Sequence, residues 1–209
     1  MHTGDFVDAI LQYNKAIEFN PNNAEAFQKR GFAYYKLGEY VNALADFNMA
    51  LTLNPHLVMA YYDRGMNYYE LGNSGLAIAD YSNVIELDPG ASFAYINRAA
   101  AYAKKGDIAS ALADYNKGIE LAPDDAFPYF LRGLLFHRKE DYDQAIADYT
   151  VFIGKKPREA RVYLSRAEAY YFKKDYEKSW EDVHRAQKMG LRIDPHFLTI
   201  LKDASGREQ

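Results

Sequence analysis

Five arginines recur at a spacing of 34 residues, and an aspartate follows each of them 16 residues later. The arginines are Arg30, Arg64, Arg98, Arg132 and Arg166, and the aspartates are Asp46, Asp80, Asp114, Asp148 and Asp182. A guanidinium can bind a carboxylate of its own chain through two parallel hydrogen bonds, and it can bind an anionic ligand in the same way. Which chemistry applies depends on the elements that carry these residues.

The prolines show that the spacing extends to the whole chain. Five of the seven are also 34 residues apart, namely Pro21, Pro55, Pro89, Pro123 and Pro157. A fixed period in this range indicates stacked structural repeats. With the proline at position 32 of each unit, the full repeats are 24–57, 58–91, 92–125, 126–159 and 160–193, preceded by a half repeat, 4–23.

Each unit has the pattern of two helices joined by a short turn. Position 4 is aromatic, position 8 is Gly or Ala and position 11 is aromatic, which is the spacing of one helical stripe. After the turn, position 20 is small and position 24 is bulky in every unit, and position 32 ends the second helix. We expect position 8 to face position 20, and position 4 to face position 24, across an antiparallel helix pair.

These residues closely resemble the tetratricopeptide repeat family, whose 34-residue unit has an aromatic residue, Leu-Gly, Tyr, then Ala, Phe and Pro at matching places. The resemblance covers about residues 4–193. It implies an all-α fold, an α-solenoid of tandem helix-turn-helix repeats forming a right-handed superhelix with a concave groove. We expect a single domain, 1–209, closed by a C-terminal capping helix at 194–205. The last repeat departs from the pattern, with Ser179 at position 20 and Leu191 at position 32.

The antiparallel arrangement places the arginine at position 7 close to the aspartate at position 23. The half repeat lacks a first helix and therefore lacks the arginine, and its position 23 is Gln12 instead of aspartate. We therefore predict five structural Arg–Asp ion pairs, inside or between hairpins, because a semi-buried arginine usually has a carboxylate partner. The alternative is that these arginines bind anions in the groove.

No residue pattern indicates catalysis or a cofactor. The chain has no cysteine, and its five histidines fall at unrelated repeat positions, so we expect neither a metal site nor an enzyme. The glycines fit helix packing and turns and form no phosphate-binding loop. The net charge of −4 gives no reason to expect nucleic acid or a membrane as partner. Without a signal peptide, a transmembrane segment or cysteine, we expect a cytoplasmic location.

The resemblance also implies that positions 2, 5, 6, 9, 12 and 13 of the first helices line the concave groove. Those positions are rich in aromatic and apolar residues, and such a surface is typical of a binding site. The candidate groove residues are Tyr35, Tyr62, Met66, Tyr69, Phe93, Ile96, Asn97, Phe127, Phe130, Leu134, His137, Arg161 and Tyr171. The function predicted is a non-catalytic adaptor that binds an extended or helical segment of a partner protein.

Two alternatives stay open at this point. A tightly wound solenoid would bury much of the same face, with positions 2 and 9 the most affected. Substituting Tyr62 and Phe130 by alanine separates the two cases, because side chains of a binding face can be removed without unfolding the chain. The half repeat offers the other alternative: Phe6, Ile10 and Tyr13 lack a covering helix, so a second copy could cover them in a homodimer. The uncovered residues are equally explained if the chain is a regulatory segment of a larger protein whose preceding helix covers them.

Overall fold

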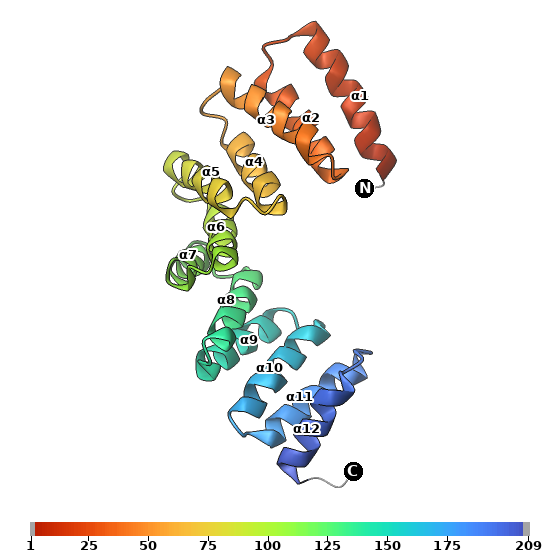
Figure 1. Ribbon diagram of the computed structural model, residues 1–209, viewed down its shortest axis with the longest axis vertical. Coiled ribbons are helices and arrows are strands. Elements are labelled where there is room, and N and C mark those ends of the chain that lie inside the picture. The colour runs from red at the N-terminus through yellow and green to blue at the C-terminus, as the bar shows by residue number, and fades with distance from the viewer. Residues whose placement is uncertain (1–2, 207–209) are drawn as a thin grey trace. The chain divides into compact units, whose positions relative to one another are not determined.

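The computed structural model describes residues 3–206, which form twelve helices and no strand. His2, one of the five histidines counted above, lies outside the described residues. The helices are α1 (Thr3–Phe19), α2 (Ala24–Lys36), α3 (Tyr40–Leu53), α4 (Val58–Glu70), α5 (Ser74–Leu87), α6 (Ser92–Lys105), α7 (Ile108–Leu121), α8 (Phe127–Arg138), α9 (Tyr142–Lys155), α10 (Ala160–Phe172), α11 (Tyr176–Lys188) and α12 (Pro195–Ser205). They follow one another pair by pair, as Figure 1 shows.

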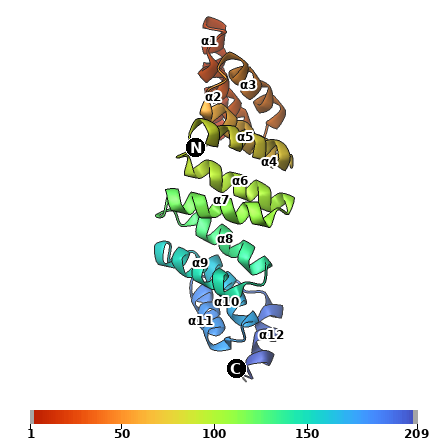
Figure 2. The same ribbon diagram turned by 90° about the vertical axis from the view of Figure 1, so that its left-hand side faces the viewer.

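The chain divides into two compact units, residues 1–121 and 122–209. In the first, each helix from α1 to α7 packs against the next, and the first helices of successive repeats also meet, α2 with α4 and α4 with α6. In the second, helices α8 to α12 pack in the same sequential way, and α8 meets α10. Each unit is therefore a solenoid of helical hairpins in which the first helices lie against one another (Figure 2).

The cores of three hairpins depend on a glycine at position 8. A methyl group added at Gly31 would lie 2.8 Å from the Phe47 ring and 3.1 Å from the Ala43 carbonyl oxygen. The same close approach joins Gly65 to Tyr81 at 2.8 Å and Gly133 to Tyr149 at 2.7 Å. Position 8 therefore makes room for the ring at position 24, a contact that the expected pairing of positions 8 and 20 did not include.

The turns inside the hairpins require a left-handed backbone at position 15. Gly38, Gly72 and Gly106 have φ angles of 78°, 79° and 90° there. In the last two repeats the same conformation is held by Glu140, with φ 62°, and Lys174, with φ 61°. Side chains with a Cβ atom adopt this region at a cost, so the second unit has a less favourable turn chemistry than the first.

Helix α12 closes the second unit. The Asp194 side chain accepts a hydrogen bond from the His196 backbone N–H at 2.9 Å, and Pro195 begins the helix. Leu201 is fully buried against the cluster around Val183 and Ala186, and Trp180 Nε1 donates to Ser205 Oγ at 3.1 Å. The apolar side of the last repeat is thereby covered.

Candidate functional site

Each arginine at position 7 binds the aspartate at position 23 of the same hairpin. In the first repeat, Arg30 Nε donates to Asp46 Oδ2 at 2.8 Å and Arg30 Nη2 donates to Asp46 Oδ1 at 2.7 Å. The other four pairs, Arg64–Asp80, Arg98–Asp114, Arg132–Asp148 and Arg166–Asp182, have the same two-bond geometry, with donor–acceptor distances from 2.6 to 2.9 Å. The aspartates are buried, so each guanidinium joins the two helices of one hairpin below the surface.

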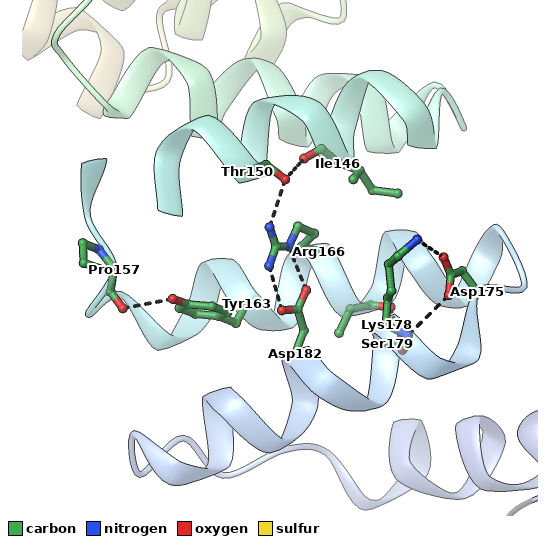
Figure 3. A network of polar contacts seen from close by, with 10 residues as sticks. Ile146, Thr150, Pro157, Tyr163, Arg166, Asp175, Lys178, Ser179 and Asp182 are labelled. Carbon is green, nitrogen blue, oxygen red and sulfur yellow. Dashed lines mark hydrogen bonds and ion pairs between the residues drawn. The ribbon is translucent and has the colours of Figure 1, made fainter. Parts of the chain in front are cut away.

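A further hydrogen bond joins the arginine to the preceding repeat. Arg166 Nη1 donates to Thr150 Oγ1 at 2.9 Å, and Thr150 in turn donates to the Ile146 carbonyl oxygen at 2.7 Å (Figure 3). The equivalent acceptors, all at position 25 of the preceding repeat, are Asn14 for Arg30, Asn48 for Arg64 and Ser82 for Arg98. In these repeats all three guanidinium nitrogens are engaged within the chain, which favours the ion-pair interpretation over anion binding.

The aromatic residues at positions 4 and 11 hold the guanidinium between them. Arg98 Cζ lies 5.6 Å from the Tyr95 ring centroid and 5.9 Å from that of Tyr102. This distance is within the range of a cation–π interaction. The hydrogen bonds that Arg98 donates to Asp114 raise the pKa of Arg98, against the opposing effect of burial. Several of the chain's many tyrosines therefore serve this network.

The candidate groove residues belong to what we call the first-helix face of each unit, defined as positions 2, 5, 6, 9, 12 and 13 of α2, α4 and α6 in the first unit and of α8 and α10 in the second. A regular offset connects it from repeat to repeat, because a residue meets the one 35 positions later. Gln28 donates to Asp63, and Asn97 Nδ2 donates to the Tyr62 hydroxyl at 3.1 Å. Lys104 Nζ donates to the Tyr69 carbonyl oxygen at 2.9 Å.

Ten of the thirteen candidates are half-buried and three are exposed. The half-buried ones are Tyr35, Tyr62, Met66, Tyr69, Ile96, Asn97, Phe130, Leu134, His137 and Tyr171, and the exposed ones are Phe93, Phe127 and Arg161. All three exposed residues are at position 2, as is Met59, which is 44% exposed. The alternative in which a tight solenoid covers position 2 most is therefore wrong for that position. Position 2 lies in the first turn of its helix.

Several of the half-buried candidates pack against the core, including Tyr62 and Phe130. The Tyr62 ring lies 6.0 Å from that of buried Tyr81, and the Phe130 ring lies 5.9 Å from that of buried Tyr149. Phe130 also packs against Phe152, at 5.5 Å. Alanine at Tyr62 and Phe130 would open cavities, so this pair of substitutions does not separate binding from folding.

In the second unit, the first-helix face continues into an aromatic cluster. The Phe172 ring stacks on Tyr142 at 5.1 Å, with the planes 8° apart, and lies 5.8 Å from His137. Burial lowers the pKa of His137. Tyr171 lies 5.4 Å from Phe172 and 5.8 Å from Phe197 of α12. Phe172 is nevertheless 53% exposed, so the cluster presents a fixed aromatic surface.

Two of the four carboxylates that the candidate set omits from this face are partly or fully removed from water. Asp63, at position 6 of the second repeat, is 2% exposed; burial raises its pKa to about 6, against the hydrogen bond from Gln28 and the charge of Lys36. Glu168, at position 9 of the fifth repeat, is half-buried, and burial raises its pKa as well. The other two, Glu25 and Glu70, are exposed. A charged residue with apolar residues one turn before and after it on the same face was the sequence signal for Asp63 and Glu168.

The described residues contain no group of three or more His, Cys, Asp or Glu side chains placed to hold a metal ion. None of the helices described is long and apolar enough to cross a membrane. The chemistry that the site offers is thus apolar and aromatic contact, with a few buried carboxyl groups.

Helical hairpins stacked in series, with the two helices of each joined by the arginine at position 7, define a helical repeat protein. The profile described as TPR repeat matches residues 2–38. Profiles described as tetratricopeptide repeat match residues 24–57, 60–90, 92–125 and 130–189. The chain belongs to the tetratricopeptide repeat family.

Solved structures share this fold. The MamA protein superposes with a TM-score of 0.74 at 22% identity, over 82% of this chain and 98% of MamA. YrrB, described as a TPR protein with an unusual peptide-binding site, gives 0.70 at 21% identity, over 85% of this chain and 91% of YrrB. A tetratricopeptide repeat protein from Parabacteroides merdae gives 0.67 at 24% identity, over 98% and 79% of the two chains. No curated protein matches the sequence.

Proposed function

We propose that the chain is a non-catalytic protein-interaction scaffold whose first-helix face binds a segment of a partner protein. The observation that carries the proposal is the exposure of large apolar side chains at position 2. Met59 is 44% exposed, Phe93 36% and Phe127 52%, and Phe172 adds a further ring that is 53% exposed. Each unit therefore exposes two of these apolar side chains on its own first-helix face. Such exposure is typical of binding surfaces, and rigid aromatic rings are their usual anchors.

The packing beneath these rings supports the same proposal. Phe93 lies edge-on to Tyr62, with ring centroids 4.8 Å apart, and Lys156 Nζ lies 4.6 Å from the Phe127 ring centroid. Side chains that are already fixed lose little conformational entropy when a partner binds. Membership of the tetratricopeptide repeat family, and the peptide-binding site described for YrrB, agree with a peptide or protein ligand.

Affinity capture from the native source tests the proposal. The wild-type chain is compared with a Phe93→Ala/Phe127→Ala variant, in which two exposed rings of the face are removed. The matched control is Val41→Ala/Leu76→Ala, because Val41 is 78% exposed and Leu76 51% exposed on the second helices α3 and α5. Urea unfolding of all three proteins establishes that each retains its fold.

A protein captured by wild type and by the control, but not by the face variant, is the expected result. Equal capture by all three proteins, or no capture by the wild type, would contradict the proposal.

A second candidate function is self-association through α1. Val7 and Leu11 are one helical turn apart on α1 and are 49% and 53% exposed, whereas Phe6, Ile10 and Tyr13 are half-buried. A second copy covering Val7 and Leu11 would form a symmetric dimer. Sedimentation of wild type and Val7→Asp/Leu11→Asp over a range of concentrations checks this. A dimer that the variant abolishes is expected, and a monomer at every concentration removes this candidate.

A further inference from the structure

Glu168 is the one charged residue at position 9 of the first helices. The equivalent residues of the other repeats are Phe32, Met66, Ala100 and Leu134. Among the residues that the structure describes, the Glu168 carboxylate has neither a hydrogen-bond nor an ion-pair partner, although its side chain is half-buried. A carboxylate removed from water without a partner is unfavourable, and burial accordingly raises the pKa of Glu168.

The neighbouring Tyr149 hydroxyl is a second polar group without a partner. Tyr149 is fully buried at position 24 of the fourth repeat, and its hydroxyl oxygen makes no hydrogen bond within the described residues. Ala169, which follows Glu168 on α10, packs in the same core cluster as Tyr149. Burial raises the pKa of Tyr149, and the charge of Glu168 raises it further. The hydroxyl is too deeply buried to meet a ligand, so Glu168 is the one of these two groups that a ligand can reach.

Apolar side chains surround these two groups. Leu164 and Tyr171 are within one turn of Glu168 on α10, and both pack against the core cluster around Val183 and Leu201. Leu134 of α8 packs against the cluster that contains Tyr149. Glu168 is thus an unpaired carboxylate within an apolar surface.

We propose that Glu168 binds a lysine or arginine side chain of the partner segment, flanked in that segment by apolar residues. The cationic group donates hydrogen bonds to the Glu168 carboxylate, and the flanking side chains contact Leu134, Leu164 and Tyr171. An acidic residue at the same place would be repelled. This inference rests on the proposed function, because it names the chemistry of the segment that the first-helix face of the second unit would bind.

A displayed library of random 12-residue peptides, selected on the immobilised full chain, supplies the probe. The best enriched peptide is synthesised twice, once with its basic residue and once with norleucine in that place. Dissociation constants of both peptides are measured for wild type, Glu168→Gln and Glu159→Gln. Glu159 is the control, because it is an exposed residue at the start of the same helix and makes no side-chain capping bond.

We expect enriched peptides to share a basic residue between apolar ones. Norleucine should weaken binding to wild type by about tenfold or more, since hydrogen bonds to charged groups contribute that much. Glu168→Gln should weaken the basic peptide similarly and leave the norleucine peptide unchanged, and Glu159→Gln should change neither. A Glu168→Lys chain used for a second selection should enrich acidic residues instead.

The outcomes that overturn the inference differ from those that overturn the proposed function. Enriched peptides without a basic residue refute the lysine or arginine site, and so does an equal loss of affinity for both peptides in Glu168→Gln. Either result leaves the proposed binding face standing, because peptides still bind. The comparison of the two peptides on wild type holds even where a variant fails to fold. A selection that enriches no peptide refutes the proposed function, and this inference with it.

Discussion

Arg166 donates a hydrogen bond to Thr150 across the boundary between two successive repeats, while its other two nitrogens bind Asp182 of its own hairpin (Figure 3). One guanidinium therefore connects three helices, α9, α10 and α11. Stability in a repeat protein is the sum of the stabilities of single repeats and of the interfaces between them. The arginine contributes to both, because its aspartate lies inside the repeat and its threonine outside.

The Arg98–Asp114 pair should show a large coupling energy. Both side chains are mostly buried, at 18% and 10% exposure, and removing one leaves the other as an uncompensated charge. We expect Asp114→Ala to lower the free energy of unfolding by about 3 kcal/mol. Arg98→Met should cost a similar amount, and the double variant much less than the sum. Urea unfolding of the four proteins measures the cycle, and a coupling energy of zero would refute the pairing.

The contact between repeats can be tested apart from the ion pair. Ser82 Oγ accepts from Arg98 Nη1 at 2.9 Å and donates to the Ile78 carbonyl oxygen at 2.8 Å, so Ser82→Ala removes the acceptor and leaves the helix intact. We expect a loss of about 1 kcal/mol in urea unfolding. In an Arg98→Met background the same substitution should have almost no effect. An equal loss in both backgrounds would show that Ser82 acts independently of Arg98.

The Arg–Asp pair could be predicted from the sequence, but the hydrogen bond from the arginine to the preceding repeat could not. The pair has fixed residue types at a fixed spacing, and the half repeat, which has Gln12 at position 23, lacks both the arginine and the aspartate. The acceptor at position 25 changes from Asn14 to Ser82 to Thr150, so only its chemistry is shared. The pattern of residue types therefore did not reveal it, although each alternative has an oxygen that can accept a hydrogen bond.

The residues of the first-helix face were predicted from the family pattern, but which of them are exposed was not. A repeat pattern specifies which residues share a face, but the offset of 35 positions between contacting residues is a property of the packing. That offset places Asp63 under Gln28 and Asn97 beside Tyr62, while the residues at position 2 stay exposed. Unpaired groups such as the Tyr149 hydroxyl are equally invisible in a sequence, because they are defined by contacts that are missing.

The left-handed turns of the second unit should be improvable. Lys174 is exposed at φ 61°, where the equivalent residue of the third repeat is Gly106. Lys174→Gly should raise the free energy of unfolding by about 0.5–1 kcal/mol, because glycine adopts this conformation without a steric cost. Gly106→Lys should lower it by a similar amount. Thermal and urea unfolding of the two variants measure both changes, and a loss of stability in Lys174→Gly would contradict the argument.

Asp63 should make stability depend on pH. Its pKa is about 6 in the folded protein against 3.8 for an unperturbed aspartate, so between these values the folded chain retains a proton that the unfolded chain has lost. The free energy of unfolding therefore falls as the pH rises through this window. Asp63→Asn removes the buried charge and keeps an oxygen that can accept from Gln28. It should equal wild type near pH 4 and exceed it by about 1–3 kcal/mol at pH 7.

Gln28 provides the internal check on that assignment. Its hydrogen bond opposes the effect of burial on Asp63, so Gln28→Ala should raise the pKa further and move the pH window upward. Urea unfolding from pH 4 to pH 8 measures all three proteins. A difference between wild type and Asp63→Asn that stays constant over this range would show that Asp63 keeps the same charge in both states.

Tyr149→Phe tests whether the unpaired hydroxyl destabilises the chain without a ligand. The variant removes a fully buried oxygen that has no hydrogen bond within the described residues, and Phe47 fills the same position of the first repeat without one. We expect the free energy of unfolding to rise by about 1 kcal/mol, because the cost of an unsatisfied buried group disappears. Tyr163→Phe is the matched comparison, since its hydroxyl donates to the Pro157 carbonyl oxygen at 3.2 Å and its loss should lower stability. A loss of stability in Tyr149→Phe as well would mean that the hydroxyl is satisfied in the free protein.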